Sequence, residues 1–303
     1  MSDGRLAGRR VTVRRSAWLG DAERDAYFAR IGYHGPAAPT LETLFAIHRA
    51  HLHAIPYENL DIHLGRTLVL DPQANFHKLV YGGRGGWCYE MNGVLGAVLQ
   101  SLGYDVRYLS GTVGRERRGD AAEGNHLVLL VTLDQPWVVD VGFGDGFLEP
   151  IPLVEGTYRQ GFLQYGLVRD GERWTVLNHP MGSADRFDFT LEPRFLENFA
   201  AQCHELQTSP ESGFVQHTVC QRFVTDGLVT LRGAVLREIR ASGVTETTLG
   251  SAPAWGRAIL EHFGLAIPGV EGLFPGVWER HLAWAAAREA EANAITSELP
   301  AAE

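Results

Sequence analysis

Residues 84–90 read Arg-Gly-Gly-Trp-Cys-Tyr-Glu and place a cysteine where a glycine-rich turn ends and a helical pattern begins. The positive end of the helix dipole favours the thiolate form of a cysteine in the first turn. The thiolate is the reactive species, and cysteine needs less activation than the other nucleophilic side chains. The segment therefore predicts that Cys88 acts as a nucleophile.

A nucleophilic cysteine needs a base, and His126 is the leading candidate because it opens the apolar strand at residues 127–131. Asp140 closes the next strand, at residues 137–140. If these strands form a hairpin, residues near 126 and 140 lie opposite each other, and the carboxylate can orient the imidazole as in Ser-His-Asp triads. Taken singly, each residue is more typical of a core thiol, a core histidine and a turn former.

The remaining cysteines and the histidine-rich segment give no sign of a metal site. The chain has three cysteines, without a Cys-x-x-Cys pair, which fits neither a disulfide framework nor a zinc site and agrees with a reducing compartment. The histidines at positions 48, 51, 53 and 63 have no cysteine or carboxylate at ligand spacing. We therefore expect no bound metal, and packing roles for Cys203 and Cys220.

Composition and charge narrow the class of protein further. The chain has 303 residues, 45% hydrophobic content and a formal net charge of −9, so we expect neither nucleic acid nor a membrane as a partner. Residues 1–15 carry five arginines, which we interpret as a solvated arm, whereas the residues from 289 onward are rich in glutamate. The basic start lacks the apolar core of a signal peptide, so we expect a cytoplasmic protein.

The order of predicted elements is helices, then strands, then a mixed segment. Helical spacing and caps predict helices from Asp21 to Gly32, from Thr40 to Pro56, from Cys88 to Gly103 and from Ser251 to Gly264, whereas residues 60–71 look irregular. Short β-branched segments fill the middle of the chain, and Asp-Gly pairs at 170–171 and 226–227 indicate hairpins. We expect a helical domain at 1–104, a β domain at 105–214 and an α/β domain at 215–303.

Beyond these signals, the sequence resembles the arylamine N-acetyltransferases. Residues 84–90 match the nucleophile motif Arg-Gly-Gly-x-Cys-x-Glu of that family, and residues 55–60, 125–126 and 140–144 match further family segments. Residues 208–214 (Thr-Ser-Pro-Glu-Ser-Gly-Phe) match the segment near the coenzyme A site, with a departure at Gln207, where the family often has serine. The matches are spread over roughly residues 20–270.

The resemblance implies an α+β fold with an N-terminal helical domain, a central antiparallel β-barrel, a C-terminal α/β lid and a papain-like or transglutaminase-like cysteine triad. It also implies ping-pong transfer of an acetyl group from acetyl-CoA, through acetyl-Cys88, to an arylamine, arylhydrazine or arylhydroxylamine. His126 would be the base and Asp140 its partner. The matching positions for the acceptor pocket are Tyr89, Phe143 and Phe214. Those for coenzyme contacts are Thr208 and Ser209.

Two further residues of the family motifs carry opposite charges. Arg84 and Glu58 match family motifs, and we interpret them as a structural ion pair behind the nucleophile, since buried charges need partners.

Three alternative functions stay open. The protein could be an amide synthase that closes a macrolactam from a carrier-bound polyketide, since such enzymes resemble the same family. A cysteine hydrolase would use the same triad, and a non-catalytic binding module would use none of it. Fold and triad do not by themselves fix the substrate.

Overall fold

The computed structural model describes residues 18–297, with the side chains of residues 291–297 left out of the description. The basic arm predicted at residues 1–15 and the glutamates at 291, 298 and 303 therefore lie outside what is described. Among the described residues, no helix has both the length and the apolar character that crossing a bilayer requires.

Residues 18–101 contain a group of helices: α1 (Asp21–Ile31), α2 (Leu41–Ala54), α3 (Leu60–His63), α4 (Pro72–Phe76) and α5 (Cys88–Ser101). The predicted helix limits are confirmed where a cap marks them. Gly32 ends α1 with a φ of 66°, and the Thr40 hydroxyl accepts the Thr43 N–H at the start of α2. The short helix α3 lies in a stretch that we expected to be irregular.

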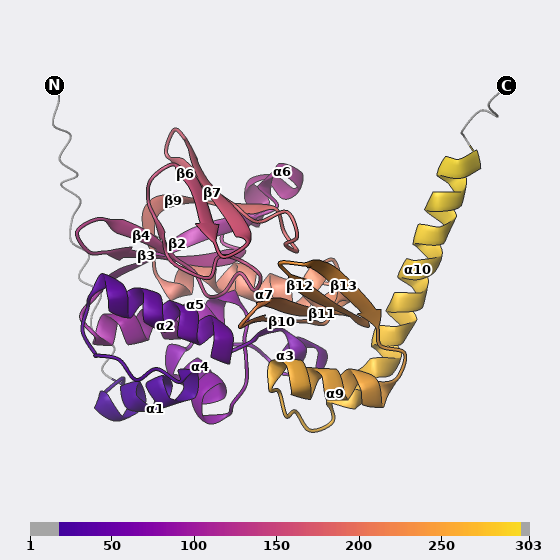
Figure 1. Cartoon of the computed structure of the whole chain (residues 1–303), viewed down its shortest axis with the longest axis horizontal. Helices are drawn as coiled ribbons and strands as arrows, with labels where there is room; N and C mark the ends of the chain where they lie inside the picture. Colours follow the sequence, from indigo (N-terminus) through magenta and orange to yellow (C-terminus); the bar gives the residue numbers. More distant parts are fainter. Residues whose placement is uncertain (1–17, 298–303) are drawn as a thin grey trace.

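The middle of the chain forms an eight-stranded sheet that curls into a barrel-like shape above the helices (Figure 1). Its strands are β2 (Asp105–Val113), β3 (His126–Thr132), β4 (Pro136–Val139), β5 (Ile151–Pro152), β6 (Gly156–Gln160), β7 (Leu163–Asp170), β8 (Arg173–Leu177) and β9 (Arg186–Arg194). Their spatial order is β5-β4-β3-β2-β9-β8-β7-β6, and every pairing is antiparallel, as predicted. The short helix α6 (Arg115–Arg118) follows β2 at the rim of the sheet. Helix α5 packs against β2 and β3, so the helical part and the sheet share one core.

A second antiparallel sheet combines distant parts of the chain. Its order is β1-β10-β11-β12-β13, with β1 (Tyr57–Glu58) followed by β10 (Val219–Val224), β11 (Gly227–Arg232), β12 (Val235–Arg240) and β13 (Gly243–Thr248). Strand β1 comes from the helical part and pairs Tyr57 with Gln221. The sequence analysis did not predict this pairing, because two residues carry too weak a strand signal.

Four helices flank the second sheet: α7 (Ala200–Thr208), α8 (Gly213–Gln216), α9 (Ala252–Phe263) and α10 (Phe274–Ser297). Helix α9 has the predicted caps, Ser251 and Gly264, and packs an apolar face onto the sheet in a second core. Helix α10 begins beside α9 and projects away from the rest of the described chain at the right of the view (Figure 1). We propose the three-domain division with boundaries near residues 104 and 214.

Candidate active site

Cys88 is the first residue of α5 and lies buried at the end of the glycine-rich turn. Extended backbone at Trp87 starts the helix, and the Glu90 carboxylate accepts the Trp87 N–H at 3.2 Å. Gly85 has no room for a side chain, because an added Cβ would lie 2.1 Å from the Pro56 carbonyl oxygen. The turn therefore needs glycine in order to pass the chain closely behind the start of α5.

His126 and Asp140 meet because β3 and β4 form the predicted hairpin, in which Leu129 pairs with Val139. The Nε2 atom of His126 lies 2.6 Å from Oδ2 of Asp140, and both side chains are buried. Since Nε2 donates to the carboxylate, Nδ1 is the ring nitrogen left for Cys88 or a substrate. Cys88 and His126 line the same cleft, so the structure brings together all three residues that the sequence singled out.

Asn92 fixes the Asp140 carboxylate from α5, one turn after the cysteine. Its Nδ2 donates to Asp140 Oδ1 and to the Leu127 carbonyl oxygen, both at 2.7 Å, and its Oδ1 accepts the Val141 N–H at 2.9 Å. The Gly142 N–H adds a second bond to Asp140 Oδ1 at 2.8 Å. The helix that carries Cys88 thus also holds the carboxylate that bonds His126. Sequence reasoning missed Asn92, although its spacing of four from Cys88 places it on the same helix face.

His48 holds the backbone of Asp140 from α2. Its Nδ1 lies 2.9 Å from the Leu148 carbonyl oxygen, and its Nε2 lies 3.1 Å from the Asp140 carbonyl oxygen and 3.3 Å from the Asp140 nitrogen. The ring stacks on Phe147, with centroids 5.8 Å apart. Burial lowers the pKa of His48 to about 4, so the imidazole is neutral at neutral pH. His48 therefore acts as a fixed hydrogen-bonding group behind Asp140.

Burial raises the pKa of the Cys88 thiol well above its ordinary value, because an isolated thiolate would lose its hydration. The backbone N–H groups of Leu127 and Tyr89 act in the opposite direction without reversing this shift. Burial therefore opposes the helix N-terminus, which the sequence analysis expected to favour the thiolate. A thiolate can form here as a pair with an imidazolium at His126, since that pair has no net charge.

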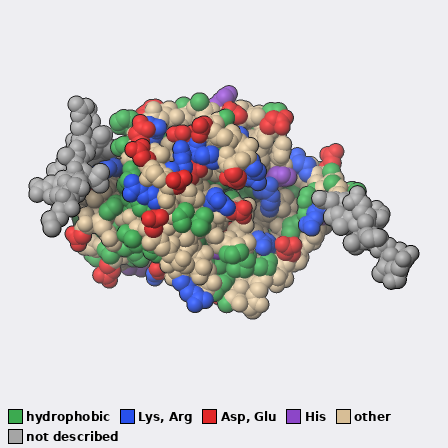
Figure 2. Space-filling view, turned by 90° about the horizontal axis from the view of Figure 1, so that it is seen from above, with side chains coloured by type: hydrophobic (Ala, Val, Ile, Leu, Met, Phe, Trp, Pro, Cys, Tyr) green, Lys and Arg blue, Asp and Glu red, His purple; other side chains and the backbone are tan. Residues whose placement is uncertain are grey.

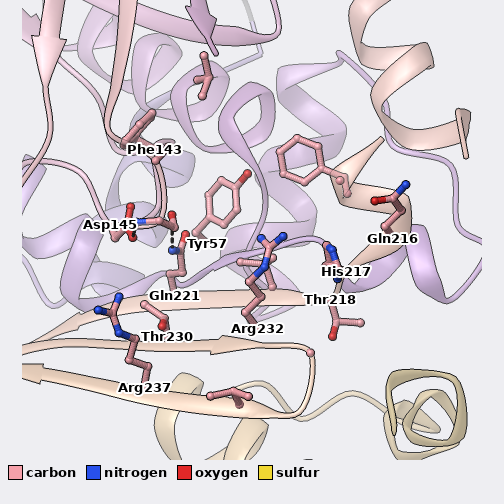
Figure 3. Close-up of a pocket in the computed structure, with 18 of the residues that line it drawn as sticks. Tyr57, Phe143, Asp145, Gln216, His217, Thr218, Gln221, Thr230, Arg232 and Arg237 are labelled. Carbon is pink, nitrogen blue, oxygen red and sulfur yellow. Dashed lines mark hydrogen bonds between the residues drawn. The ribbon is translucent and has the colours of Figure 1, made fainter. Parts of the chain in front are cut away.

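The cleft in front of Cys88 has a volume of about 730 Å³, within the range of small-molecule sites. The barrel-like sheet and its loops form one side, and the second sheet forms the other. Figure 3 shows Phe143 and Asp145, from the segment after β4, facing Thr230 and Arg232 of the second sheet across this space.

Two of the three aromatic residues predicted for the acceptor pocket line this cleft. Phe143 packs edge-on against His126 with ring centroids 5.4 Å apart, and Phe214 packs in the same way against Trp87. Tyr89 does not line it. Its ring packs beside Phe199, and its hydroxyl donates to the Gly124 carbonyl oxygen at 2.6 Å. Tyr89 thus has a packing role behind the site, because α5 turns it away from the cleft.

Thr208 and Ser209, the predicted coenzyme contacts, also lie away from the cleft. The Thr208 hydroxyl donates to the His204 carbonyl oxygen within α7, and the Ser209 hydroxyl accepts the Glu211 N–H. Both groups are therefore used in ending α7 and forming the following turn. The neighbouring residues Phe214, His217 and Thr218 line the cleft in their place.

The sequence analysis found no basic cluster that could bind phosphate groups, and the structure corrects this. Arginines from three separate segments line the cleft: Arg117, Arg118, Arg232, Arg237, Arg280 and Arg288. The sequence could not reveal this group, because its members are as much as 171 positions apart and meet only in the folded chain.

The ion pair predicted behind the nucleophile is confirmed and belongs to a larger network. Arg84 donates to Glu58 at 2.6 Å and contacts Asp61 at 3.0 Å. Lys78 bridges Asp61 and Glu90, each at 2.8 Å. Because Glu90 also holds the start of α5, this network anchors the nucleophile turn from behind.

His51, Cys203 and Cys220 lie outside the site and are buried. His51 bonds the Tyr27 hydroxyl at 2.7 Å, and Cys203 and Cys220 are buried free thiols. Within residues 18–290 no group of three or more histidine, cysteine and acidic side chains is placed to hold a metal ion.

Comparison with known proteins gives consistent matches to one family. The family described as N-acetyltransferase matches residues 40–271. The arylamine N-acetyltransferase of Mycolicibacterium smegmatis is 37% identical over 255 residues, which are 81% of this chain and 93% of that protein. The arylamine N-acetyltransferase / N-hydroxyarylamine O-acetyltransferase of Salmonella typhimurium is 31% identical over 252 residues, 81% of this chain and 90% of that protein. The structure of Mycobacterium marinum arylamine N-acetyltransferase in complex with CoA is also similar. It has a TM-score of 0.77 and 32% identity, and the match covers 84% of this chain and 97% of that one.

Proposed function

Because the chain belongs to the arylamine N-acetyltransferase family, we propose that Cys88, His126 and Asp140 carry out its acetyl transfer. The protein is an acyltransferase, and its acceptors are arylamines. The observation that supports the triad most strongly is the 2.6 Å bond between His126 and Asp140 beside the cleft that contains Cys88.

In the first half-reaction, Cys88 Sγ attacks the carbonyl carbon of the acetyl thioester while its proton passes to Nδ1 of His126. Asp140 stabilises the imidazolium and keeps the ring in one orientation. When the tetrahedral intermediate collapses, the C–S bond to the donor breaks. The departing thiolate takes the proton from His126, which leaves acetyl-Cys88 and a neutral imidazole.

In the second half-reaction, the acceptor nitrogen attacks the acetyl-cysteine and His126 removes its proton. The Cys88 thiolate leaves and recovers a proton from His126, which restores the enzyme. We propose that Phe143 and Phe214 contact the aromatic ring of the acceptor, since both line the cleft and Phe143 lies beside His126. Arylhydrazines and arylhydroxylamines carry a similar nucleophile on a similar ring and are proposed as further acceptors.

The donor that we propose is acetyl-CoA. The relative from Mycobacterium marinum is described in complex with CoA. In this chain, the arginine-lined cleft supplies positive charge for the phosphate groups of such a donor. The fit rests on residues that the sequence analysis did not single out, whereas the predicted contacts Thr208 and Ser209 use their hydroxyls elsewhere.

The test is intact-mass analysis of the protein after incubation with acetyl-CoA. We expect one acetyl adduct that disappears when an arylamine is added. The adduct should be absent in Cys88→Ala and retained in Cys203→Ala and Cys220→Ala, whose thiols are also buried. An adduct that survives in Cys88→Ala would refute the assignment of the nucleophile. If acetyl-CoA and other acyl-CoA donors give no adduct at all, the proposed donor is wrong.

A further inference from the structure

Tyr57 faces the cleft because of its place in strand β1. Side chains alternate between the two faces of a strand, and the next residue, Glu58, pairs with Arg84 in the network behind the nucleophile. Tyr57 therefore points the opposite way and lines the same cleft as Cys88. Figure 3 shows its side chain projecting into this space, with the hydroxyl pointing away from the second sheet.

Backbone hydrogen bonds on both sides of Tyr57 fix it to the turn that carries the nucleophile. The Glu58 N–H donates to the Gly86 carbonyl oxygen at 2.9 Å, and the Gly86 N–H donates to the Pro56 carbonyl oxygen at 3.3 Å. Gly86 lies two positions before the nucleophile in the sequence. The tyrosine ring also packs on Gly144, where an added Cβ would lie 3.3 Å from the Tyr57 Cγ. The ring and the nucleophile are therefore held in a fixed relation.

The Tyr57 hydroxyl has no hydrogen-bond partner in the described part of the chain. The residue is only 7% exposed, yet its hydroxyl forms no hydrogen bond with residues 18–290. Burial raises the pKa of Tyr57 well above its ordinary value, and a thiolate at Cys88 and the Asp145 carboxylate act in the same direction. The phenol therefore keeps its proton at neutral pH and can donate a hydrogen bond to a ligand.

The proposed acetyl transfer needs such a donor. When Cys88 Sγ bonds to the acyl carbon, the electrons of the carbonyl double bond move onto its oxygen. This anion forms in a site that excludes most water, where fixed hydrogen-bond donors such as tyrosine hydroxyls stabilise it. The backbone N–H groups of Leu127 and Tyr89 are directed at the Cys88 sulfur and lower the pKa of its thiol. They serve the thiolate, so the acyl oxygen requires another donor.

Other polar side chains of the cleft are less suited to this role. Two buried amides line it, but Asn125 donates to the Val113 carbonyl oxygen at 2.9 Å and Gln221 to the Ser183 hydroxyl at 3.2 Å. Several arginines that line the cleft are exposed: Arg117, Arg118, Arg232, Arg280 and Arg288. Seen from above, basic side chains gather around a hollow beside α10 (Figure 2). The cations thus lie toward solvent, whereas Tyr57 lies at the buried end of the cleft.

We propose that the Tyr57 hydroxyl donates a hydrogen bond to the acyl oxygen of the tetrahedral intermediates at Cys88, which makes Tyr57 a further catalytic residue. This inference rests on the proposed function, because it assumes that Cys88 is acetylated. The proton stays on Tyr57 throughout. Its hydrogen bond strengthens as the oxygen becomes negative and weakens when the carbonyl double bond re-forms and the carbon–sulfur bond to the leaving thiolate breaks. Because the same oxygen becomes negative in both half-reactions, the hydroxyl acts in both.

The test removes this hydroxyl in Tyr57→Phe and measures the two half-reactions separately. We expect the single-turnover rate constants for acetylation of Cys88 by acetyl-CoA and for discharge of acetyl-Cys88 to an arylamine to fall by similar factors, on the order of 100-fold. The acetyl-CoA concentration that gives half the maximal rate should change less than about 2-fold, since the bond strengthens mainly in the transition state. The infrared carbonyl stretch of isotope-labelled acetyl-Cys88 should move to a higher frequency in Tyr57→Phe.

Tyr27→Phe is the matched control, because Tyr27 is also buried but its hydroxyl bonds His51 at 2.7 Å, outside the cleft. Its urea midpoint should fall, because a buried hydrogen bond is lost, whereas that of Tyr57→Phe should not change. Both rate constants of Tyr27→Phe should stay within about 2-fold of the parent protein.

Three outcomes separate this inference from the proposed function. If Tyr57→Phe forms and discharges acetyl-Cys88 as fast as the parent protein, the inference fails and the proposed function stands. A change in only one half-reaction would also overturn the inference, since Tyr57 would then contact only the donor or only the acceptor. If the parent protein forms no acetyl-Cys88, the proposed function fails, and this inference fails with it.

Discussion

Replacing Asn92 with alanine tests whether α5 positions the catalytic carboxylate as well as carrying the nucleophile. The Asn92 side chain is fully buried and makes three hydrogen bonds, to Asp140 Oδ1, to the Leu127 carbonyl oxygen and to the Val141 N–H. In Asn92→Ala the last two groups lose their side-chain partner, and Asp140 Oδ1 keeps only the Gly142 N–H. An unsatisfied buried group costs about 1–3 kcal/mol, so we expect a loss of stability on the order of 3 kcal/mol.

The loss of activity should exceed what a change in stability explains. Without Asn92, the Asp140 carboxylate can turn and no longer holds His126 Nε2 in one orientation. Removing groups that hold catalytic side chains in place commonly costs on the order of 10- to 100-fold in activity. We expect that reduction in the rate constant for acetylation of Cys88, measured by quenched-flow mass analysis in a single turnover under conditions where the variant is folded.

Asn59→Ala is the matched control for this experiment. Asn59 is buried to a similar degree and also makes three side-chain hydrogen bonds, but none to a carboxylate: it donates to two carbonyl oxygens (Phe214 and His217) and accepts the Val219 N–H. Urea unfolding should give a similar loss of stability for both variants, whereas the acetylation rate constant of Asn59→Ala should change less than about 3-fold. If Asn92→Ala is destabilised but acetylates Cys88 as fast as the parent protein, Asn92 does not position the triad.

Three further predictions follow from contacts in the structure. In Gly142→Ala, the new methyl group would lie 2.6 Å from the Cys88 Cα, so the Asp140 loop must shift and acetyl transfer should fall on the order of 100-fold. Gly93→Ala is the control, because an added Cβ has no heavy atom within 4 Å, and its steady-state rate should match that of the parent protein. Arg84→Met leaves the Glu58 carboxylate buried without that cation and should cost about 3 kcal/mol in urea unfolding, against less than about 1 kcal/mol for Arg66→Met, whose side chain is 51% exposed. Equal losses in those two variants would contradict the structural role of the Arg84–Glu58 pair. Burial raises the pKa of the Asp145 carboxyl to about 6, above its ordinary value. The folded protein therefore holds the carboxyl proton more tightly than the unfolded chain, and the free energy of unfolding falls as pH rises from about 4 to 6. Asp145→Asn should therefore be more stable than the parent protein at pH 7 by on the order of 3 kcal/mol in urea unfolding, and that difference should vanish near pH 4. A difference independent of pH would refute this assignment.

The triad could be predicted from the sequence because the signals for its geometry are local. The glycine turn sets the start of α5 at Cys88, and the spacing of two short strands brings His126 and Asp140 together once they form a hairpin. The caps at Thr40 and Ser251 likewise act within a few residues of themselves and gave correct helix limits. The family resemblance joined these separate signals into one site, and comparison with known proteins confirmed the family.

The surroundings of the triad could not be predicted in the same way. Tyr89 follows the nucleophile directly, yet the direction of α5 turns its ring into the core. Thr208 lies in a motif near the coenzyme site of the family, but its hydroxyl bonds within α7. A motif identifies a residue type at a position, whereas helix orientation and competing hydrogen bonds decide whether that side chain reaches the cleft.

By itself the sequence indicated the type of reaction, because its motifs resemble a known family and because a cysteine at a helix start and a histidine and an aspartate on one hairpin depend on interactions between near neighbours. Only the tertiary structure showed that Cys88 is buried, which raises its thiol pKa and adds to the need for the proton acceptor already expected at His126. It also decided the shape and charge of the cleft. Strand β1 pairs with β10, and arginines from α6, the second sheet and α10 meet around one space. Those contacts join residues more than a hundred positions apart, and no local pattern records which distant segments will meet when the core forms.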